Sequence, residues 1–316
     1  MLSFSPVNGL IILGSLSFSF WQPSGGCMQP EDVTQPIHVN DLNQLSQSQF
    51  GIDISRFFSG TETHLAKVEP HGFYQFTSAR SGDDRFYIEL MQKLAYNNNR
   101  DEFVEAAKHV SSNFKVLDIG CGPGWFADVC KGHYKGIDLN PDAVNLARSK
   151  GRNVHLEKLE DQIAGGFDVV TMFQVLEHVD RPESFIAAAA RCVANGGKLI
   201  IATPDMEGYI GGSVNHLLNY PPHHMSWWSA DSIGSLIRAN GFSVESVWHE
   251  RLQPDHLQSW IFSLLHPRRG PHMDMSSRAK MMDLASKVLS RAFRPFYNPV
   301  PHLTGQSVMV VGQRPR

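Results

Sequence analysis

The 316-residue sequence has little charge and almost no cysteine. Charged residues make up 19% of the chain, and the formal net charge is -3. General binding to nucleic acid needs an excess of basic residues that displaces counterions from phosphate, so we expect no nucleic-acid partner. The four cysteines show neither CxxC pairing nor the clustering of a zinc site. They predict reduced thiols in a cytoplasmic protein with no metal site.

Basic residues and long apolar runs are both missing from the N-terminal part of the chain. No Lys or Arg precedes Arg56, and the apolar segment 10–20 is short. A membrane-spanning helix needs about 20 apolar residues, and a secretory signal begins with a basic region. We therefore expect residues 1–55 to be a disordered lead-in, of which residues 29–55 are rich in Gln, Ser and Asn.

Residues 56–112 are expected to form an N-terminal helical cap. Asp83 and Asp84 precede apolar residues that recur at helical spacing, which places acidic groups at the start of a helix. A second helical pattern covers residues 102–110. The main domain is expected to follow as residues 113–316, with an insertion at 251–300.

Short apolar runs alternate with helical patterns from residue 114 onward. The alternation predicts an α/β domain with a mostly parallel, Rossmann-like sheet and helices on both faces. Prolines near the helix starts suit the first turn of a helix. The strands are expected at 114–119, 134–138, 153–157, 167–173, 197–203, 242–248 and 307–311. The helices are expected at 123–131, 141–150, 182–194 and 231–240.

Three glycines, Gly120, Gly122 and Gly124, follow the first of these strands. Glycine lets the backbone turn sharply and approach a ligand closely. The dinucleotide fingerprint GxGxxG is the competing interpretation, but Trp125 stands where its third glycine would be. A Trp side chain there would obstruct a pyrophosphate. The spacing therefore favours a ligand without a pyrophosphate over a nicotinamide dinucleotide.

Asp138 ends the second expected strand, 18 residues after Gly120. A carboxylate at this place can accept hydrogen bonds from two ribose hydroxyls. The same side chain could instead cap the helix that starts near Pro141. With the glycine loop in register, we favour the ribose role.

The order of these motifs resembles that of class I S-adenosylmethionine-dependent methyltransferases, and in particular the group that includes ubiquinone-biosynthesis O-methyltransferases. The similar segments are 116–124, 136–138, 167–170, 175–179, 195–199 and 203–204. The resemblance covers roughly residues 110–250 and returns at the last strand. It implies a seven-stranded sheet whose last strand is antiparallel, with S-adenosyl-L-methionine as cofactor.

The resemblance also implies roles for individual residues. Asp118 and the loop from Gly120 to Gly124 would hold the methionine end of the cofactor, Asp138 would bind the ribose, and Leu139 would pack on the adenine. Leu159 and Glu160 would meet the adenine edge, and Phe173 and Gln174 would line the pocket near the sulfonium. The cofactor-binding residues implied in this way are Asp118, Gly120, Cys121, Gly122, Gly124, Asp138, Leu139, Leu159, Glu160, Phe173 and Gln174.

Two adjacent histidines, His223 and His224, lie on a Pro-rich loop after the fifth expected strand. A hydroxyl acceptor benefits from a base with a pKa near the working pH, and His is the usual choice. We therefore predict His223 and His224 as catalytic residues, with a purely structural role in the loop as the alternative. Glu177 and His178 look catalytic in isolation, but in the resembling group a loop-bracing role is favoured.

Three functions follow from these motifs. The preferred one is an enzyme that methylates an oxygen atom of a small or lipid-linked metabolite, such as a quinone precursor or a glycan. The alternatives are a NAD-dependent Rossmann oxidoreductase and a non-catalytic S-adenosylmethionine-binding protein. The sequence does not determine the oligomeric state.

The segment 251–300 carries eight Lys and Arg residues against three Asp residues, so it is cationic on an otherwise acidic protein. Apolar residues recur in it at helical spacing. We expect two helices that pack over the substrate entrance with solvated cationic faces. The alternative is a peripheral contact with anionic lipid.

Overall fold

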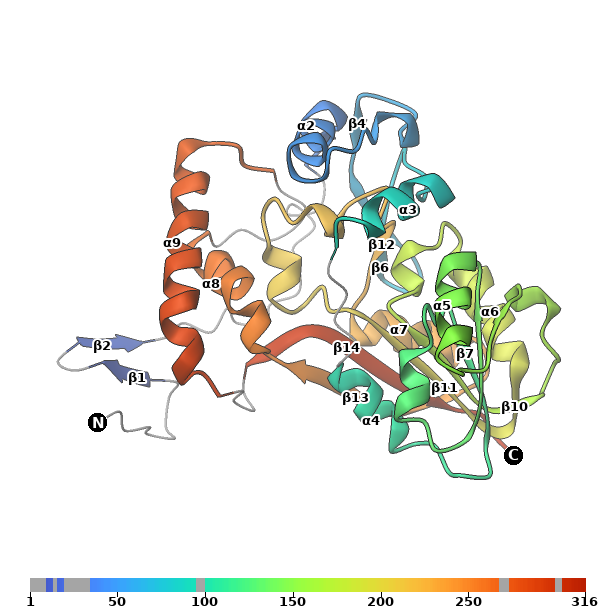
Figure 1. Cartoon of the computed structure of the whole chain (residues 1–316). Coiled ribbons are helices and arrows are strands. Elements are labelled where there is room, and N and C mark those ends of the chain that lie inside the picture. The colour runs from blue at the N-terminus through green and yellow to red at the C-terminus, as the bar shows by residue number, and fades with distance from the viewer. Residues whose placement is uncertain (1–9, 14–15, 20–34, 95–99, 267–272, 299–302) are drawn as a thin grey trace.

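The computed structural model describes residues 10–13, 16–19, 35–94, 100–266, 273–298 and 303–316. Seven of the described strands form one sheet, which crosses the molecule in Figure 1. These strands are β7 (Lys115–Ile119), β8 (His133–Asp138), β9 (Val154–Leu156), β10 (Phe167–Phe173), β11 (Val193–Pro204), β13 (Ser243–Arg251) and β14 (Thr304–Gln313). Their order in the sheet is β13-β14-β11-β10-β7-β8-β9.

One strand of this sheet runs against the others. β14 pairs antiparallel with both β11 and β13, whereas β7, β8, β9, β10 and β11 pair in parallel. This arrangement confirms the expected α/β fold with a seven-stranded, mostly parallel sheet and an antiparallel last strand. Each expected strand is present within a few residues of its predicted bounds.

Helices cover both faces of the sheet. They are α4 (Asp101–Ala107), α5 (Pro141–Ser149), α6 (Pro182–Cys192) and α7 (Ala230–Ala239). Alternate residues of β10 point to opposite faces, as the pleat requires. Val170 and Met172 share a core with α6 and α7, while Phe173 shares another with Phe103 of α4. The carboxyl ends of β7, β8 and β10 therefore lie at one edge of a sheet that is buried on both sides.

The helix expected at 123–131 is not formed. The chain makes only a short 3-10 turn, η2 (Trp125–Asp128), before β8 begins. The whole connection from Ile119 to His133 has to return over the sheet, and the glycine loop occupies its first residues. Too little chain remains for an α-helix of several turns. The N–H groups near the expected cofactor site therefore come from the glycine loop and not from a long helix.

The N-terminal region differs from the expected lead-in and helical cap. Helix α2 (Val39–Phe50) lies where disorder was expected, because Leu42 and Leu45 form an apolar stripe that packs in a second core. The region 56–112 also contains strands. They are β4 (Glu62–Thr63), which pairs with β3 (Ile37–His38), and β5 (Leu65–Val68) and β6 (Phe73–Phe76), which form a three-stranded sheet with β12 (Ser226–Trp227). Helix α3 (Asp84–Met91) is confirmed, with Asp83 as its N-cap.

The remaining elements are short or belong to the insertion. β1 (Leu10–Leu13) and β2 (Leu16–Ser19) form an antiparallel hairpin. The insertion contains α8 (Leu257–Leu265) and α9 (Ser277–Phe293), so two helices are present there as expected. The other short 3-10 turns are η1 (Ser55–Phe57), η3 (Leu159–Asp161), η4 (Leu176–His178), η5 (Tyr209–Gly212), η6 (Leu217–Asn219), η7 (Pro254–His256) and η8 (Arg294–Phe296).

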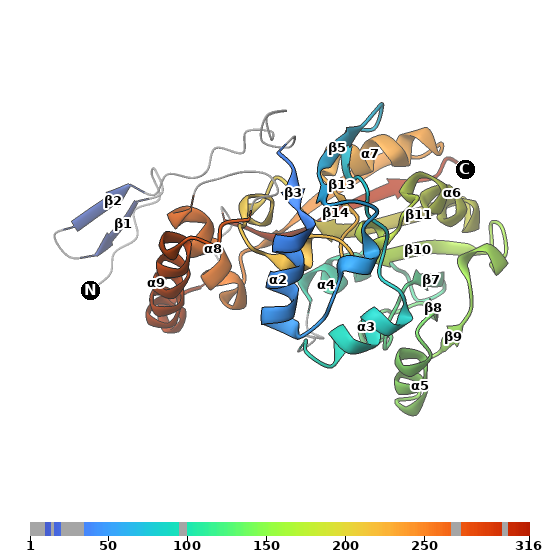
Figure 2. The same ribbon diagram turned by 90° about the horizontal axis from the view of Figure 1, so that it is seen from above.

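Both views place α9 at the opposite end of the molecule from α5 and β9 (Figures 1 and 2). The insertion is therefore remote from β8 and β9, the second and third strands of the sheet along the chain.

Within the described residues, none of the helices is both long and apolar enough to cross a membrane.

Candidate functional site

The glycine loop after β7 has the backbone that its sequence predicts. Gly120, Gly122 and Gly124 have φ angles of 63°, 53° and 72°, which lie in the left-handed region. Side chains other than glycine adopt this region at a cost. At Gly120 a Cβ atom would also lie 2.6 Å from Cγ2 of Val175, so glycine is required there for both reasons. The loop thus forms a close backbone turn at the end of β7.

Asp118, two residues before the loop, is buried in the sheet. Its Oδ1 accepts a hydrogen bond from the Thr171 hydroxyl (2.8 Å), and its Oδ2 accepts one from the Tyr134 hydroxyl (2.9 Å). Burial raises the pKa of Asp118 to about 7, while the two hydrogen bonds act in the opposite direction. Asp118 therefore ties β7 to both neighbouring strands. Its predicted contact with the cofactor's amino group remains a prediction.

Asp138 at the end of β8 connects the strand to the glycine loop. Its Oδ2 accepts a hydrogen bond from the Gly122 N–H (2.7 Å), and its Oδ1 accepts one from the Asn140 N–H (2.8 Å). The N-cap of α5 is Asn140, whose side chain accepts from two main-chain N–H groups of the first turn. Asp138 is therefore not the N-cap of α5; its carboxylate contacts the glycine loop, and its ribose role stays a prediction.

The other residues implied for the adenine side lie around these two strand ends. Leu139 is 66% exposed, which is unusual for a large apolar side chain beside a buried strand. Leu159 packs in the core of the sheet, and Glu160 is exposed, with its main-chain oxygen accepting from Arg191. The thiol of Cys121 lies 2.6 Å from the place of a Cβ on Gly136, so the loop packs tightly on β8. Leu139 is the side chain most available for a flat ligand.

Phe173 ends β10, and Gln174 follows it at the same edge of the sheet. The Phe173 ring packs against Phe103, with ring centroids 4.9 Å apart. Gln174 has a positive φ of 55°, and its Nε2 donates to Oε2 of Glu102 and to the Ser307 hydroxyl. A non-glycine residue in this backbone conformation is strained and is held by its surroundings. The strain and the two hydrogen bonds fix the direction of the Gln174 side chain.

His223 and His224 meet Glu177 and His178 in one group, which we call the histidine cluster; Glu177 and His224 are buried, and His178 and His223 are half-buried. The His223 and His224 rings stack with centroids 4.7 Å apart, and the His178 ring lies 4.5 Å from that of His223. Oε1 of Glu177 lies 3.8 Å from Nε2 of His178 and 4.0 Å from Nε2 of His224. The structure thus joins the two catalytic residues predicted from the sequence to the Glu-His pair that was expected to brace a loop.

Hydrogen bonds determine which nitrogen carries the proton in two of these rings. Nδ1 of His178 lies 2.6 Å from the main-chain oxygen of His223, and Nδ1 of His224 lies 3.1 Å from Oδ1 of Asn219. Both oxygens can only accept, so each Nδ1 donates and each Nε2 keeps a lone pair. The cluster therefore presents unprotonated Nε2 atoms to Glu177.

Burial shifts the pKa values of all four groups toward their uncharged forms. It lowers the pKa of His178 to about 4 and the pKa values of His223 and His224 well below the usual range. It raises the pKa of Glu177 to about 8. Among the described residues, neither oxygen of Glu177 accepts a hydrogen bond from another residue, and Nδ1 of His223 has no hydrogen-bond partner. Perturbed and unpaired titratable groups of this kind gather at functional sites.

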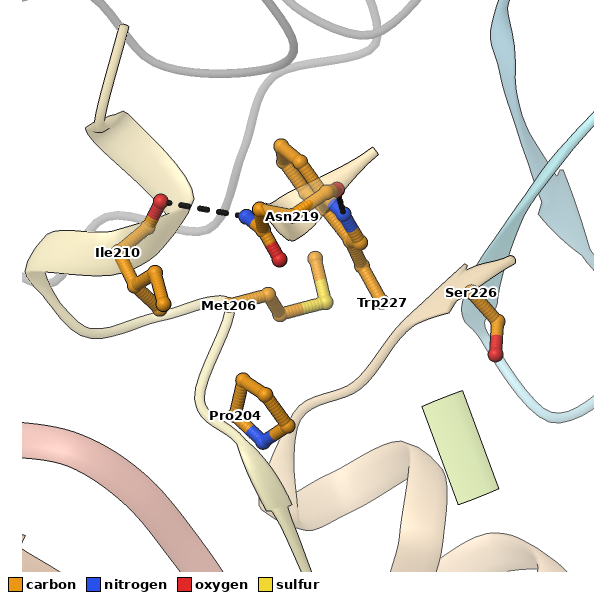
Figure 3. Close-up of a pocket in the computed structure, with 6 residues that line it drawn as sticks. All are labelled: Pro204, Met206, Ile210, Asn219, Ser226 and Trp227. Atoms are coloured by element: carbon orange, nitrogen blue, oxygen red, sulfur yellow. Dashed lines mark hydrogen bonds between the residues drawn. The ribbon is translucent and has the colours of Figure 1, made fainter. Parts of the chain in front are cut away.

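Sequence reasoning did not single out three residues that organise the site. Tyr134 and Thr171 satisfy Asp118, and Asn219 orients His224. Asn219 also donates from Nδ2 to the Ile210 oxygen and accepts from the Trp227 indole through its main-chain oxygen, beside a narrow pocket (Figure 3). These contacts depend on strand register and on loop packing. No local pattern around these residues marks them.

Comparison with known proteins gives a consistent result. A family described as a methyltransferase domain matches residues 79–247. The ubiquinone biosynthesis O-methyltransferase of Idiomarina loihiensis is 32% identical over 184 residues, which cover 52% of this chain and 74% of that protein. The protein of the same name from Thiobacillus denitrificans is 43% identical over 101 residues, or 28% of this chain. The chain covers only 44% of the length of that second relative.

A solved structure of an S-adenosylmethionine-dependent methyltransferase from Archaeoglobus fulgidus aligns with 73% of this chain and 100% of that chain. The sequence identity is 18% and the TM-score is 0.46. The fold assignment therefore rests on the strand order of the chain itself.

Proposed function

The chain belongs to the S-adenosylmethionine-dependent methyltransferase family, and we propose that it methylates an oxygen atom of a small or lipid-linked metabolite. S-adenosylmethionine is the cofactor of this family. The relatives that match the chain are named ubiquinone biosynthesis O-methyltransferases, which favours a hydroxylated quinone precursor over a glycan as the acceptor.

The observation that carries this proposal is the pairing of Asp138 with the glycine loop. Gly120, Gly122 and Gly124 at the end of β7 adopt left-handed φ angles and carry no Cβ atoms, and the Asp138 carboxylate at the end of β8 accepts a hydrogen bond from the Gly122 N–H of this loop. Trp125 packs against the core that contains α4 and stands at the position of the third dinucleotide glycine. A NAD-dependent oxidoreductase is therefore not favoured.

The chemistry places few demands on side chains. The cofactor supplies an activated methyl group, and the protein holds donor and acceptor in line. A hydroxyl acceptor loses its proton as the oxygen–methyl bond forms. Nε2 of His224 and the ring of His223 keep lone pairs that can take this proton, but burial lowers the pKa of both rings well below the value that suits a base near neutral pH.

Calorimetric titration with S-adenosylmethionine and S-adenosylhomocysteine tests the cofactor assignment. The folded chain should bind both, and Asp138→Ala should weaken binding by about 1.5–3 kcal/mol for each charge-assisted hydrogen bond that is lost. Asp142→Ala removes an exposed carboxylate from the first turn of α5 and is the matched control. Unchanged affinity in Asp138→Ala would refute the ribose assignment, and no binding to the native chain would refute the function.

The role of the histidines is tested by comparing transfer with binding. His223→Ala and His224→Ala should slow methylation of a catechol-type acceptor more than they weaken cofactor binding. If both quantities fall equally, the two side chains only maintain the loop. Cofactor binding with no transfer to any hydroxyl acceptor would favour the non-catalytic alternative.

We further propose that α9 contacts an anionic lipid surface. The exposed apolar side chains on and just after this helix are Met281, Leu284, Val288, Leu289, Phe293 and Phe296. Its buried face carries the small residues Ala279, Ser286 and Ser290. At 100° per residue, Lys280, Lys287 and Arg291 lie beside the apolar stripe. An apolar stripe flanked by cations complements lipid tails and anionic headgroups.

Vesicle sedimentation tests this contact. The chain should bind vesicles that contain phosphatidylglycerol more tightly than pure phosphatidylcholine vesicles. Replacing Met281, Leu284 and Val288 together with Ser should reduce binding at least about tenfold, because apolar burial is lost. Ile163→Ser, which changes an exposed apolar side chain elsewhere, is the control. Equal binding by the triple variant would refute the contact.

A further inference from the structure

The histidine cluster has the geometry of an empty ligand set. One nitrogen each from His178, His223 and His224 lies within 4.8 Å of the other two. The three residues come from two segments: η4, and the loop that follows η6. Among the described residues, these three form a group that could hold a metal ion.

The outer hydrogen bonds of the cluster match those of metal-bound histidines. A histidine that binds a metal usually donates its second N–H to a carbonyl or carboxylate oxygen, which fixes the ring and its tautomer. His178 donates to the His223 main-chain oxygen, and His224 donates to Oδ1 of Asn219. In these two of the three rings, Nε2 lies about 4 Å from Oε1 of Glu177. These outer hydrogen bonds are a separate observation from the short distances between the rings.

Glu177 provides the second line of evidence. Its side chain is 1% exposed, and within the described part of the chain neither carboxylate oxygen accepts a hydrogen bond from another residue. A buried carboxyl group without a partner is costly unless a cation or a donor completes its environment. Oε1 lies about 4 Å from two imidazole nitrogens, a gap too long for a hydrogen bond and wide enough for an ion between them.

We propose that His178, His223, His224 and Glu177 bind one zinc ion. Neutral imidazoles and a carboxylate are ligands that Zn²⁺ accepts in a tetrahedral set. At Zn–N distances of about 2.0–2.1 Å, the ligand atoms would have to approach one another by about an ångström. The sequence predicted no metal site because zinc was sought among the cysteines. The ligands are instead histidines, which lie 45 residues apart in the chain.

The zinc site rests on the geometry of the cluster and not on the proposed methyl transfer. A bound cation would link η4 to the loop after η6 and would occupy the lone pairs that otherwise serve as bases. If the acceptor oxygen reaches this site, the cation lowers the pKa of that hydroxyl in place of a free imidazole. Zinc binding and activity are therefore separate measurements.

The test uses the full chain without an affinity tag, freed of metal by a chelator and dialysed. Titration with zinc chloride should give one site per chain, and cobalt chloride should give the visible absorption bands of tetrahedral Co²⁺. His223→Gln and Glu177→Gln should each weaken zinc binding by at least about a hundredfold. Asn219→Ala, which only removes the outer hydrogen bond to His224, should weaken it about 10–100-fold.

His249→Gln is the control, because Nδ1 of His249 pairs with Asp205 outside the cluster. Its zinc affinity should equal that of the native chain. No stoichiometric binding by the folded native chain, or binding that survives His223→Gln and Glu177→Gln, overturns the proposal. Circular dichroism and S-adenosylmethionine binding are recorded on the same samples. A chain that binds zinc but not the cofactor would overturn the proposed function and leave the metal site standing.

Discussion

Two buried carboxyl groups at the same edge of the sheet have opposite surroundings. Asp118, on β7, accepts hydrogen bonds on both oxygens from the neighbouring strands. Glu177, in η4 just after β10, is equally buried and accepts none from any other residue that the structure describes. A buried polar group is normally paired, so the first environment is complete in the chain alone and the second is not. Asp118 therefore belongs to a part of the structure that is complete without a ligand, whereas Glu177 belongs to a site that needs an added group.

The same contrast extends to the residues around each carboxyl group. Near Asp118, the glycine loop and Asp138 are held by main-chain hydrogen bonds. Near Glu177, three imidazoles are close together but have few bonds with one another. Pre-formed hydrogen bonds reduce the reorganisation needed on binding. The glycine loop is therefore ready for its ligand, whereas the histidine cluster must contract around one.

The largest expected effect is that of Gly120→Ala, in the glycine loop beside Asp118. A Cβ at this position would overlap Val175 and also force a left-handed alanine. We expect a loss of about 3 kcal/mol or more in the free energy of unfolding, and loss of cofactor binding. Gly151→Ala has a similar φ of 73° with open space around its Cβ, so it should cost only about 1 kcal/mol. Chemical denaturation of both variants measures the difference, and equal losses would show that the contact with Val175 is unimportant.

The second prediction concerns the pH dependence of Asp118. Its pKa is about 7 in the folded chain and 3.8 in the reference state, so folding favours the protonated form. The stability contributed relative to Asp118→Asn is fully present below about pH 4 and is lost as the pH rises to about 7, by at most about 4 kcal/mol. Urea unfolding of both proteins without cofactor measures this difference across the range. A difference that grows with pH would contradict the environment described for Asp118.

The third prediction tests the surroundings of the Glu177 carboxyl group. In metal-free protein, Glu177→Met replaces an unpaired buried carboxyl group with an apolar side chain of similar length. The free energy of unfolding should rise by about 1–3 kcal/mol, because the desolvation cost is removed. Thermal unfolding in the presence of chelator measures this change. Destabilisation by Glu177→Met under these conditions would mean that the carboxyl group has a partner in the native chain.

The smallest expected effect is that of Leu139→Ser. This side chain is 66% exposed without a ligand, so its loss should leave the free energy of unfolding within about 0.5 kcal/mol of the native value. If adenine packs on it, affinity for S-adenosylmethionine should fall by about 1 kcal/mol. Leu146→Ser, on the exposed face of α5, serves as the control. Unchanged cofactor affinity would place the adenine elsewhere.

Local sequence patterns were sufficient for the sheet and the glycine loop. Apolar runs bounded by glycine predicted the seven strands, and the spacing of Gly120, Gly122 and Gly124 matched positions that require positive φ angles. These features depend on short-range backbone chemistry. Family resemblance added the single seven-stranded sheet and the antiparallel last strand, which no local pattern contains, while the order of the strands came from the structure.

The wrong helix prediction at 123–131 and the two features that were missed, α2 and the histidine cluster, have physical causes. The helix expected at 123–131 failed because a short connection to β8 limits its length, and α2 was missed because polar composition concealed the spacing of Leu42 and Leu45. The histidine cluster joins residues that are 45 positions apart. The cluster forms because the loop after η6 packs on η4. A single sequence does not contain the distance between these two segments.

The position of β14 has a consequence for the folding of the chain during its synthesis. β14 follows all the other described strands of the sheet in the chain, yet it lies between β11 and β13. Until residues 304–313 have left the ribosome, β11 has an open edge and β13 has no partner in the sheet. Open, apolar strand edges pair readily with other chains. The nascent chain is therefore most prone to aggregation after β13 has emerged, and this interval ends only when β14 is inserted.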